Sequence, residues 1–199
     1  ISPEIGLAET QQTLVMNNLR GRVKLQTDGQ LKTGLDVVKM ACLGAEEYGF
    51  ATGALIVLGC VMMRKCHLNT CPTGIATQDE QLRKRFIGKS EYLVNYFRFI
   101  AREVREILAS VGARSLNEII GRTDLLEQDR NVGNWKTGGI DMSRILYFQE
   151  AGKRFSILNS VEQQHKIEGV MDYDLIKQSE IAIHGAQRVW ISKNINNVD

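Results

Sequence analysis

The sequence predicts an α/β fold whose parallel sheet is incomplete. Its first third predicts a helix, a strand, a helix and a strand in that order, and both strands end in a glycine. This alternation is typical of α/β architecture. The run Ala54–Leu58 is short, continuous and apolar, which favours a strand buried on both faces. Two parallel strands do not form a stable sheet alone, so we expect the earlier strands to lie outside this sequence.

The first elements follow from periodicity and from turn residues. Residues 7–18 enclose an apolar group between polar positions and predict a helix, which Arg20–Gly21 ends. Val23–Asp28 alternates in part and predicts a short strand that a glycine turn closes. Thr33 is a suitable N-cap for the next helix, and we expect that helix to end at Gly49.

The second half of the chain carries weaker signals after one long helix. Residues 90–111 have an apolar stripe at helical spacing and predict an amphipathic helix. Ser115–Glu118 has the pattern of a capping box that opens a short helix. Residues 128–170 are poor in regular pattern, whereas 173–186 predicts a further helix and Arg188–Ile191 the start of a strand.

Composition and charge exclude several classes of protein. Of 199 residues, 43% are hydrophobic and 24% charged, which is ordinary for a globular protein, and the net charge is only +2. We therefore expect no nucleic-acid partner and no anionic membrane surface. The longest apolar stretch, Phe50–Met63, is shorter than the roughly 20 residues that cross a bilayer. The first residues lack both a signal-peptide pattern and an initiator methionine, so we expect a piece of a longer chain.

Three cysteines are the strongest chemical signal in the sequence. Cys60, Cys66 and Cys71 lie six and then five residues apart, and Pro72 follows the last. These spacings match neither the two-residue gaps of most structural zinc sites nor a thioredoxin-type pair. Thiolates suit the irons of an iron–sulfur cluster, and a proline after the last cysteine also occurs in bacterial ferredoxins. The alternatives are three reduced structural cysteines, or a zinc site with His67 as the fourth ligand.

The remaining cysteine and the basic residues of this segment have simpler interpretations. Cys42 lies on the apolar face of its helix, so we expect a core residue. Arg64 and Lys65 would offset the negative charge of thiolates and sulfides. No catalytic residue is assigned, because no nucleophile elbow, Walker loop or dinucleotide fingerprint is present.

A second, weaker signal suggests a phosphate site. The segment Asp28–Gly34 contains Gly29 and Lys32, follows a strand and leads into a helix, as phosphate-binding loops do. Ala51–Gly53 lies beside the next predicted strand and could supply further backbone donors. An ordinary turn is the alternative, and it is the commoner explanation of such a pattern.

Taken together, four segments resemble the large subunit of glutamate synthase, at the end of its FMN-binding synthase domain. The resemblance covers roughly residues 5–126, and the cysteine loop is its most specific part. The segments are LAETQQTLVMNNLRGRV, DGQLKTGLDV, LGAEEYGFATGALIVLGCVMMRKCHLNTCPTGIATQD and IIGRTDLL. The closing SEIAIHGAQRVWI is similar, with weaker motifs, to the approach into the family's C-terminal β-helical domain.

The resemblance implies a fold. Residues 1–126 would be the end of a (β/α)8 barrel, its last two βα units, with the iron–sulfur loop and a helical extension. Val23–Asp28 would then be strand seven, and Ala54–Leu58 would lie at strand eight. Residues 127–172 would connect to residues 173–199, the start of the β-helix-type domain.

The resemblance also implies an activity. The family is an oxidoreductase that transfers ammonia derived from glutamine to 2-oxoglutarate and reduces the product to L-glutamate, with electrons passing through a 3Fe-4S cluster to FMN. Partners would be the rest of the large subunit and either ferredoxin or an electron-donating small subunit that uses NAD(P)H and FAD. The location would be the cytoplasm, or the plastid in a plant or alga. We expect the isolated chain to be inactive.

Residue by residue, the resemblance carries over two sets of ligands. Cys60, Cys66 and Cys71 would bind the 3Fe-4S cluster. The positions that match those near the FMN phosphate are Asp28, Gly29, Gln30, Lys32, Thr52 and Gly53. Two departures weaken the flavin assignment locally, because Gln30 and Ala51 stand where the family pattern has glycine and each adds a side chain.

Overall fold

The computed structural model describes residues 2–129, 134, 136, 138–148, 155–165 and 167–195. The chain divides into two compact units, Ile1–Val161 and Glu162–Asp199, which are considered separately. The predicted division into 1–126, 127–172 and 173–199 concerns domains of a larger protein and stays a prediction. Within the described residues, no helix is long and apolar enough to cross a membrane.

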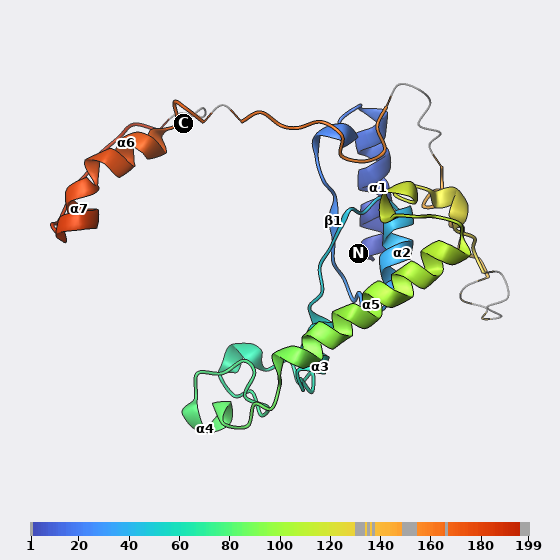
Figure 1. Cartoon of the computed structure of the whole chain (residues 1–199), viewed down its shortest axis with the longest axis horizontal. Helices are drawn as coiled ribbons and strands as arrows, with labels where there is room; N and C mark the ends of the chain where they lie inside the picture. Colours follow the sequence, from blue (N-terminus) through green and yellow to red (C-terminus); the bar gives the residue numbers. More distant parts are fainter. Residues whose placement is uncertain are drawn as a thin grey trace. The chain divides into compact units, whose positions relative to one another are not determined.

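The first unit holds short strands among helices (Figure 1). Its elements, in chain order, are α1 (Pro3–Met16), the 3₁₀ turn η1 (Arg20–Arg22), β1 (Gln26–Thr27), α2 (Gly34–Cys42), β2 (Glu47–Tyr48), α3 (Thr52–Val57), η2 (Cys66–Leu68), α4 (Glu80–Arg83), α5 (Ser90–Ser110), η3 (Leu116–Glu118) and η4 (Thr123–Leu125).

A βαβ unit forms the centre of this first part. β1 and β2 pair in parallel, with Gln26 opposite Glu47 and Thr27 opposite Tyr48, and α2 connects them. The Gly49 amide extends the pairing by donating to the Thr27 carbonyl at 2.7 Å. The strand predicted at Val23–Asp28 is therefore present as a shorter core. The unit fits the α/β class, and the (β/α)8 barrel stays a prediction.

The second strand was predicted in the wrong place. Ala54–Leu58 lies almost wholly in α3, not in a strand, and the strand that pairs with β1 precedes it. Gly59, with φ of 96°, ends α3 in a Schellman motif. Its amide donates to the Ile56 carbonyl, and the Cys60 amide to the Leu55 carbonyl, both at 2.9 Å. A short apolar run ending in glycine is ambiguous between strand and helix, and here the helix cap decides it.

Helix α2 begins where predicted and ends earlier. Thr33 and Asp36 form a reciprocal capping box, in which the Asp36 amide donates to Thr33 Oγ1 at 3.2 Å and the Thr33 amide to Asp36 Oδ2 at 3.0 Å. The helix stops at Cys42, because Gly44 takes a φ of 116° and packs where a Cβ would strike the Gln11 side chain. The predicted end at Gly49 is therefore wrong.

Helix α2 contributes to two buried clusters. One face packs on α5 and the other toward α1 (Figure 1). The first cluster contains Val37, Val38, Ala41, Cys42, Ile100, Val104, Leu108 and Ile119; the second contains Leu7, Ala8, Leu31, Met40, Leu43 and Ala45. The two helices touch closely at Gly34, where a Cβ would lie 2.8 Å from the Val104 nitrogen. The Gly34 amide donates to Glu103 Oε2 on α5 at 2.7 Å.

A buried arginine ties the end of α1 to the βαβ unit. The Arg20 side chain has no exposed surface, and its Nη2 lies 2.6 Å from Glu46 Oε2 in an ion pair. Its Nε donates to Gln11 Oε1 at 2.5 Å, its Nη1 to the Val23 carbonyl at 2.7 Å and its Nη2 also to the Gly44 carbonyl at 3.0 Å. Each of the three guanidinium nitrogens thus has a partner, as the burial of a charge requires.

The later elements agree with prediction in part. Helix α5 occupies Ser90–Ser110, as predicted. The Ser115–Glu118 capping box does not form, because the Glu118 carboxylate accepts from the Arg114 amide at 3.1 Å and the segment is a 3₁₀ turn. The described residues of 128–170 contain no helix or strand, in keeping with their weak pattern; Trp135 and Thr137 lie outside the described residues.

The second unit contains two short helices where one was predicted. These are α6 (Met171–Gln178) and α7 (Glu180–Gly185), which break at Ser179. Arg188–Ile191 is not a strand, because the described residues of this unit offer no partner strand for it. The Arg188 guanidinium instead lies 5.2 Å from the ring centroid of Trp190.

The buried ion pair yields a stability prediction. We expect Arg20→Ala to lower the free energy of unfolding by about 3–5 kcal/mol, because it leaves Glu46 and two carbonyls without their donor. Thermal or urea unfolding of the chain measures this. The matched control is Arg98→Ala on the exposed side of α5, which should change it by less than about 0.5 kcal/mol. Equal effects of the two substitutions would contradict the prediction.

Candidate functional site

The three predicted cysteines line a single pocket. Cys60, Cys66 and Cys71 contribute to its wall together with the intervening residues 61–65 and with Pro72 and Thr73. The loop that carries them connects α3 to α4, beside the N-terminal end of α5 and away from α1 and α2 (Figure 1). The short cap of α3 positions Cys60, because this residue donates the last Schellman hydrogen bond.

Cys71 has the environment of a thiolate. The Thr73 hydroxyl lies 3.4 Å from its sulfur. Hydrogen bonds from that hydroxyl first, and from the Ala76 and other backbone amides, outweigh desolvation and lower the pKa of Cys71 to about 7. The thiolate is the form that binds metals, so this cysteine is prepared for ligation at neutral pH.

The backbone of the loop adopts left-handed conformations at three residues that carry side chains. Met62, Arg64 and Asn69 have φ of 57°, 56° and 58°. Such residues are strained and gather at functional sites. Alternating right- and left-handed residues turn successive amides to one side, a geometry that binds anions and iron–sulfur clusters. The Met62 amide already lies 3.4 Å from the Cys60 sulfur, which it faces as a donor.

Asn69 connects the middle of the cysteine loop to its C-terminal end. Its side-chain oxygen accepts from the Gln78 amide at 2.6 Å and from the Thr77 hydroxyl at 2.9 Å, and the same hydroxyl reaches the Asn69 carbonyl at 2.9 Å. Gly74, with φ of 75°, packs so closely under α4 that a Cβ would strike the Leu82 carbonyl. Together these contacts hold the segment that carries Cys66 and Cys71.

Cys42 contrasts with the loop cysteines. It is 2% exposed in the core cluster between α2 and α5. Burial first, and the Asp124 charge second, raise the pKa of Cys42 to about 11. The prediction of a core residue is confirmed.

Among the described residues, no three His, Cys, Asp or Glu side chains are grouped closely enough to share a single metal ion. A cluster would hold each thiolate on a separate iron, whereas a zinc ion would need its ligands around one atom. His67, the fourth ligand of the zinc alternative, is exposed beside Cys66.

The residues predicted for phosphate binding gather at the carboxyl ends of the two strands. Asp28 follows β1, and its Cβ lies 2.9 Å from where a Cβ on Gly49, after β2, would be. Gly29 and Gln30 both have positive φ, 121° and 67°. Gln30 therefore holds a left-handed conformation that glycine would adopt freely, so this departure strains the position. The departure at Ala51 has no such effect, because its φ is −117°.

Two backbone amides of this turn already donate hydrogen bonds within the chain. The amides of Lys32 and Thr33 both donate to Asp36 Oδ2 at 3.0 Å. The Lys32 side chain is exposed, so its charge remains available to a ligand. Gly29 packs against Pro3, where a Cβ would lie 2.9 Å from Cγ. The phosphate contact predicted for Asp28–Gln30 and Lys32 stays a prediction.

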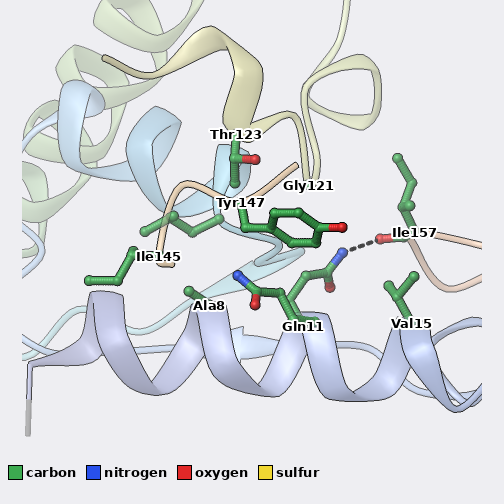
Figure 2. Close-up of a pocket in the computed structure, with 10 residues that line it drawn as sticks. Ala8, Gln11, Val15, Gly121, Thr123, Ile145, Tyr147 and Ile157 are labelled. Atoms are coloured by element: carbon green, nitrogen blue, oxygen red, sulfur yellow. Dashed lines mark hydrogen bonds between the residues drawn. The ribbon is translucent and has the colours of Figure 1, made fainter. Parts of the chain in front are cut away.

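Another pocket lies between α1 and the segments that follow α5. Figure 2 shows Gln11 between Tyr147 and Ile157, with its amide donating to the Ile157 carbonyl at 2.8 Å. The Thr123 hydroxyl at its rim is buried and has no hydrogen-bond partner among the described residues. No cysteine and none of the predicted phosphate residues lines this pocket, so it marks the packing of residues 155–161 onto α1.

Sequence reasoning missed three residues of the site, Thr73, Asn69 and Met62, and it missed the strained backbone of Arg64. Thr73 follows Cys71 by two positions, and Asn69 is of the residue type that most readily takes positive φ, so both left a signal. The strain at Met62 and Arg64 left none, because these residue types do not favour left-handed backbone.

These features define the class: a βαβ unit followed by a loop on which three cysteines line one pocket and hydrogen bonds stabilise the thiolate of one of them. Residues 1–114 match the family described as the conserved region in glutamate synthase. The chain belongs to the glutamate synthase family.

The relatives extend the match beyond that region. Over 98% of the chain, it is 50% identical to the glutamate synthase [NADPH] large chain of Bacillus subtilis and 46% identical to the chloroplastic ferredoxin-dependent glutamate synthase 2 of Arabidopsis thaliana. It is 60% identical over 63% of the chain to the large chain of Azospirillum brasilense. The chain spans only 13%, 12% and 8% of the length of these three relatives.

The stabilised thiolate predicts a pH profile. In a metal-free variant that keeps Cys71 as its sole cysteine, alkylation should follow a titration with a midpoint near pH 7, since the thiolate is the reactive form. Thr73→Val should move the midpoint upward, toward the pKa of about 8.5 of a free cysteine. Rates at a series of pH values measure both. An unchanged midpoint in Thr73→Val would contradict the role of the hydroxyl.

The Asn69 contacts predict how the loop responds to substitution. Asn69→Gly keeps the left-handed backbone but removes the side-chain acceptor, whereas Asn69→Ala removes the acceptor and strains the backbone as well. We expect the iron content of the purified full-length polypeptide to fall in the order wild type, Asn69→Gly, Asn69→Ala. Wild-type iron content in Asn69→Ala would contradict the prediction.

Proposed function

We propose that this chain is the part of a glutamate synthase large chain that carries a 3Fe-4S cluster on Cys60, Cys66 and Cys71 and contributes to the FMN phosphate site. The observation that carries the proposal is the pocket lined by all three cysteines. Thr73 supports it by stabilising the Cys71 thiolate, and the Met62 amide supports it by facing the Cys60 sulfur as a donor at 3.4 Å.

The reaction of the whole enzyme would be the reductive transfer of glutamine-derived ammonia to 2-oxoglutarate, giving L-glutamate. When bound, the cluster and the flavin supply electron transfer to the iminium formed from 2-oxoglutarate. The residues of this chain bind and orient these groups: the cysteines hold iron, and Asp28, Gly29, Gln30, Lys32, Thr52 and Gly53 lie where the phosphate of FMN would be bound.

The names of the relatives support a role for this segment that does not depend on which electron donor the enzyme uses. The Bacillus relative is named for NADPH and the Arabidopsis relative for ferredoxin, yet they are 50% and 46% identical to this chain over the same share of it. A segment that selected the donor would be expected to differ more between the two. We infer that this segment acts after electrons have entered the enzyme, whether from ferredoxin or from an electron-donating subunit.

The glutamine and 2-oxoglutarate sites would lie in the rest of the polypeptide. The chain spans 13% or less of the length of the relatives compared above. We therefore expect the isolated chain to form no glutamate. A non-catalytic iron–sulfur or zinc-binding fragment is the alternative, and metal content separates the zinc-binding fragment from a cluster.

Metal analysis of cysteine variants tests the proposal. In the full-length polypeptide prepared without oxygen, we expect iron and sulfide in the ratio of a 3Fe-4S cluster and an EPR signal in the oxidised state. Serine at Cys60, Cys66 or Cys71 should remove iron, because a hydroxyl is a poor ligand for it. Cys42→Ser is the matched control and should keep the iron. Zinc without iron in the wild type would overturn the cluster.

A further inference from the structure

A tyrosine of α5 connects the two segments proposed to bind the flavin phosphate. The Tyr96 hydroxyl donates to the Lys32 carbonyl at 2.9 Å. Lys32 ends the turn after β1, and Tyr96 lies 64 residues later in the chain, in the helix that follows the cysteine loop. The contact therefore fixes the turn through a residue of another element, helix α5.

The same hydroxyl also packs against the start of α3. A Cβ added at Gly53 would overlap the Tyr96 hydroxyl and lie 3.1 Å from its Cζ atom. The Leu31 carbonyl would be 3.5 Å from that Cβ, so the turn and the helix meet at this point. Glycine is required at position 53 because the tyrosine occupies the space of a side chain.

Neighbouring aromatic rings fix the orientation of Tyr96. Its ring centroid is 6.4 Å from that of Phe50, edge to face at 87°, and 5.2 Å from that of Phe97. Phe50 follows β2 and also packs edge to face on Phe97 at 5.3 Å. Burial, and then the Asp36 charge, raise the pKa of Tyr96, so its hydroxyl keeps its proton and remains a donor at neutral pH.

We infer that Tyr96 is a positioning residue for the flavin, which holds the Lys32 turn against Gly53 and so keeps both halves of the phosphate site in one arrangement. The inference rests on the proposed function, since it takes FMN as the ligand of this turn. A preorganised site binds more tightly because less ordering is required when the ligand arrives.

Flavin affinity of Tyr96→Phe tests the inference. In the full-length polypeptide, freed of flavin and titrated with FMN, we expect Kd to rise roughly 3- to 10-fold, the size of one neutral hydrogen bond. Iron content, the melting temperature of the flavin-free protein and kcat at saturating FMN should stay at wild-type values. The matched control is Tyr92→Phe on the same helix; Tyr92 is 45% exposed, so the Kd of this variant should not change.

A second substitution probes the contact with Gly53. Gly53→Ala should weaken FMN binding in the wild-type background, because the new Cβ displaces the hydroxyl. In the Tyr96→Phe background the same substitution should have a smaller effect, since the overlapping oxygen is gone. Equal effects of Gly53→Ala in both backgrounds would overturn the inference.

The remaining outcomes separate the inference from the proposed function. If the wild type binds FMN and Tyr96→Phe binds it within about twofold, the positioning role is wrong and the proposed function stands. If Tyr96→Phe loses iron together with flavin, Tyr96 is a general stability residue and the inference fails. If the wild type binds no FMN, both fail.

Discussion

The buried charge of Arg20 is the constraint on which the first unit depends. A guanidinium without exposed surface must have every donor satisfied, and here its partners come from α1, from the segment before β1 and from the connection between α2 and β2. Glu46 extends this network to a later segment, because its other carboxylate oxygen accepts from the Asn159 amide at 3.0 Å. The residues around Asn159 also donate to the Gly21 carbonyl. One ion pair thus sets the position of β2 and the path of a segment more than a hundred residues later.

Close packing connects the elements held by this ion pair to the two candidate cofactor sites. With β2 in place, the turns after both strands lie at one edge, and α5 crosses α2 at Gly34 with no room for a side chain. That crossing brings Tyr96 onto the turn and onto Gly53. Helix α3 then runs from Gly53 to the cap that holds the Cys60 amide. Helix α3 therefore joins the predicted phosphate residues Thr52 and Gly53 to the cysteine loop, and Tyr96 links this helix to the turn after β1.

The cysteine loop illustrates how strain and stabilisation are combined at a site. Met62 and Arg64 hold a backbone conformation unfavourable to them, while Asn69 anchors the loop through a side chain suited to it. The cost of the strained residues is offset by hydrogen bonds and by the packing of Gly74 under α4. Cys71 and Cys42 have opposite environments, because hydrogen-bond donors lower the pKa of the first whereas burial and the Asp124 charge raise the pKa of the second.

The sequence by itself determined the features that depend on near neighbours. The long stripe of α5 and the Thr33 cap follow from periodicity and capping within a few residues, whereas the role of the three closely spaced cysteines as ligands stays a prediction. Only the tertiary structure decided which segment pairs with β1, since parallel pairing joins residues far apart in sequence and the local pattern of Ala54–Leu58 suited a helix equally well. It alone also decided why Gly53 is glycine, because the group that fills its space belongs to Tyr96, and no local rule links the two.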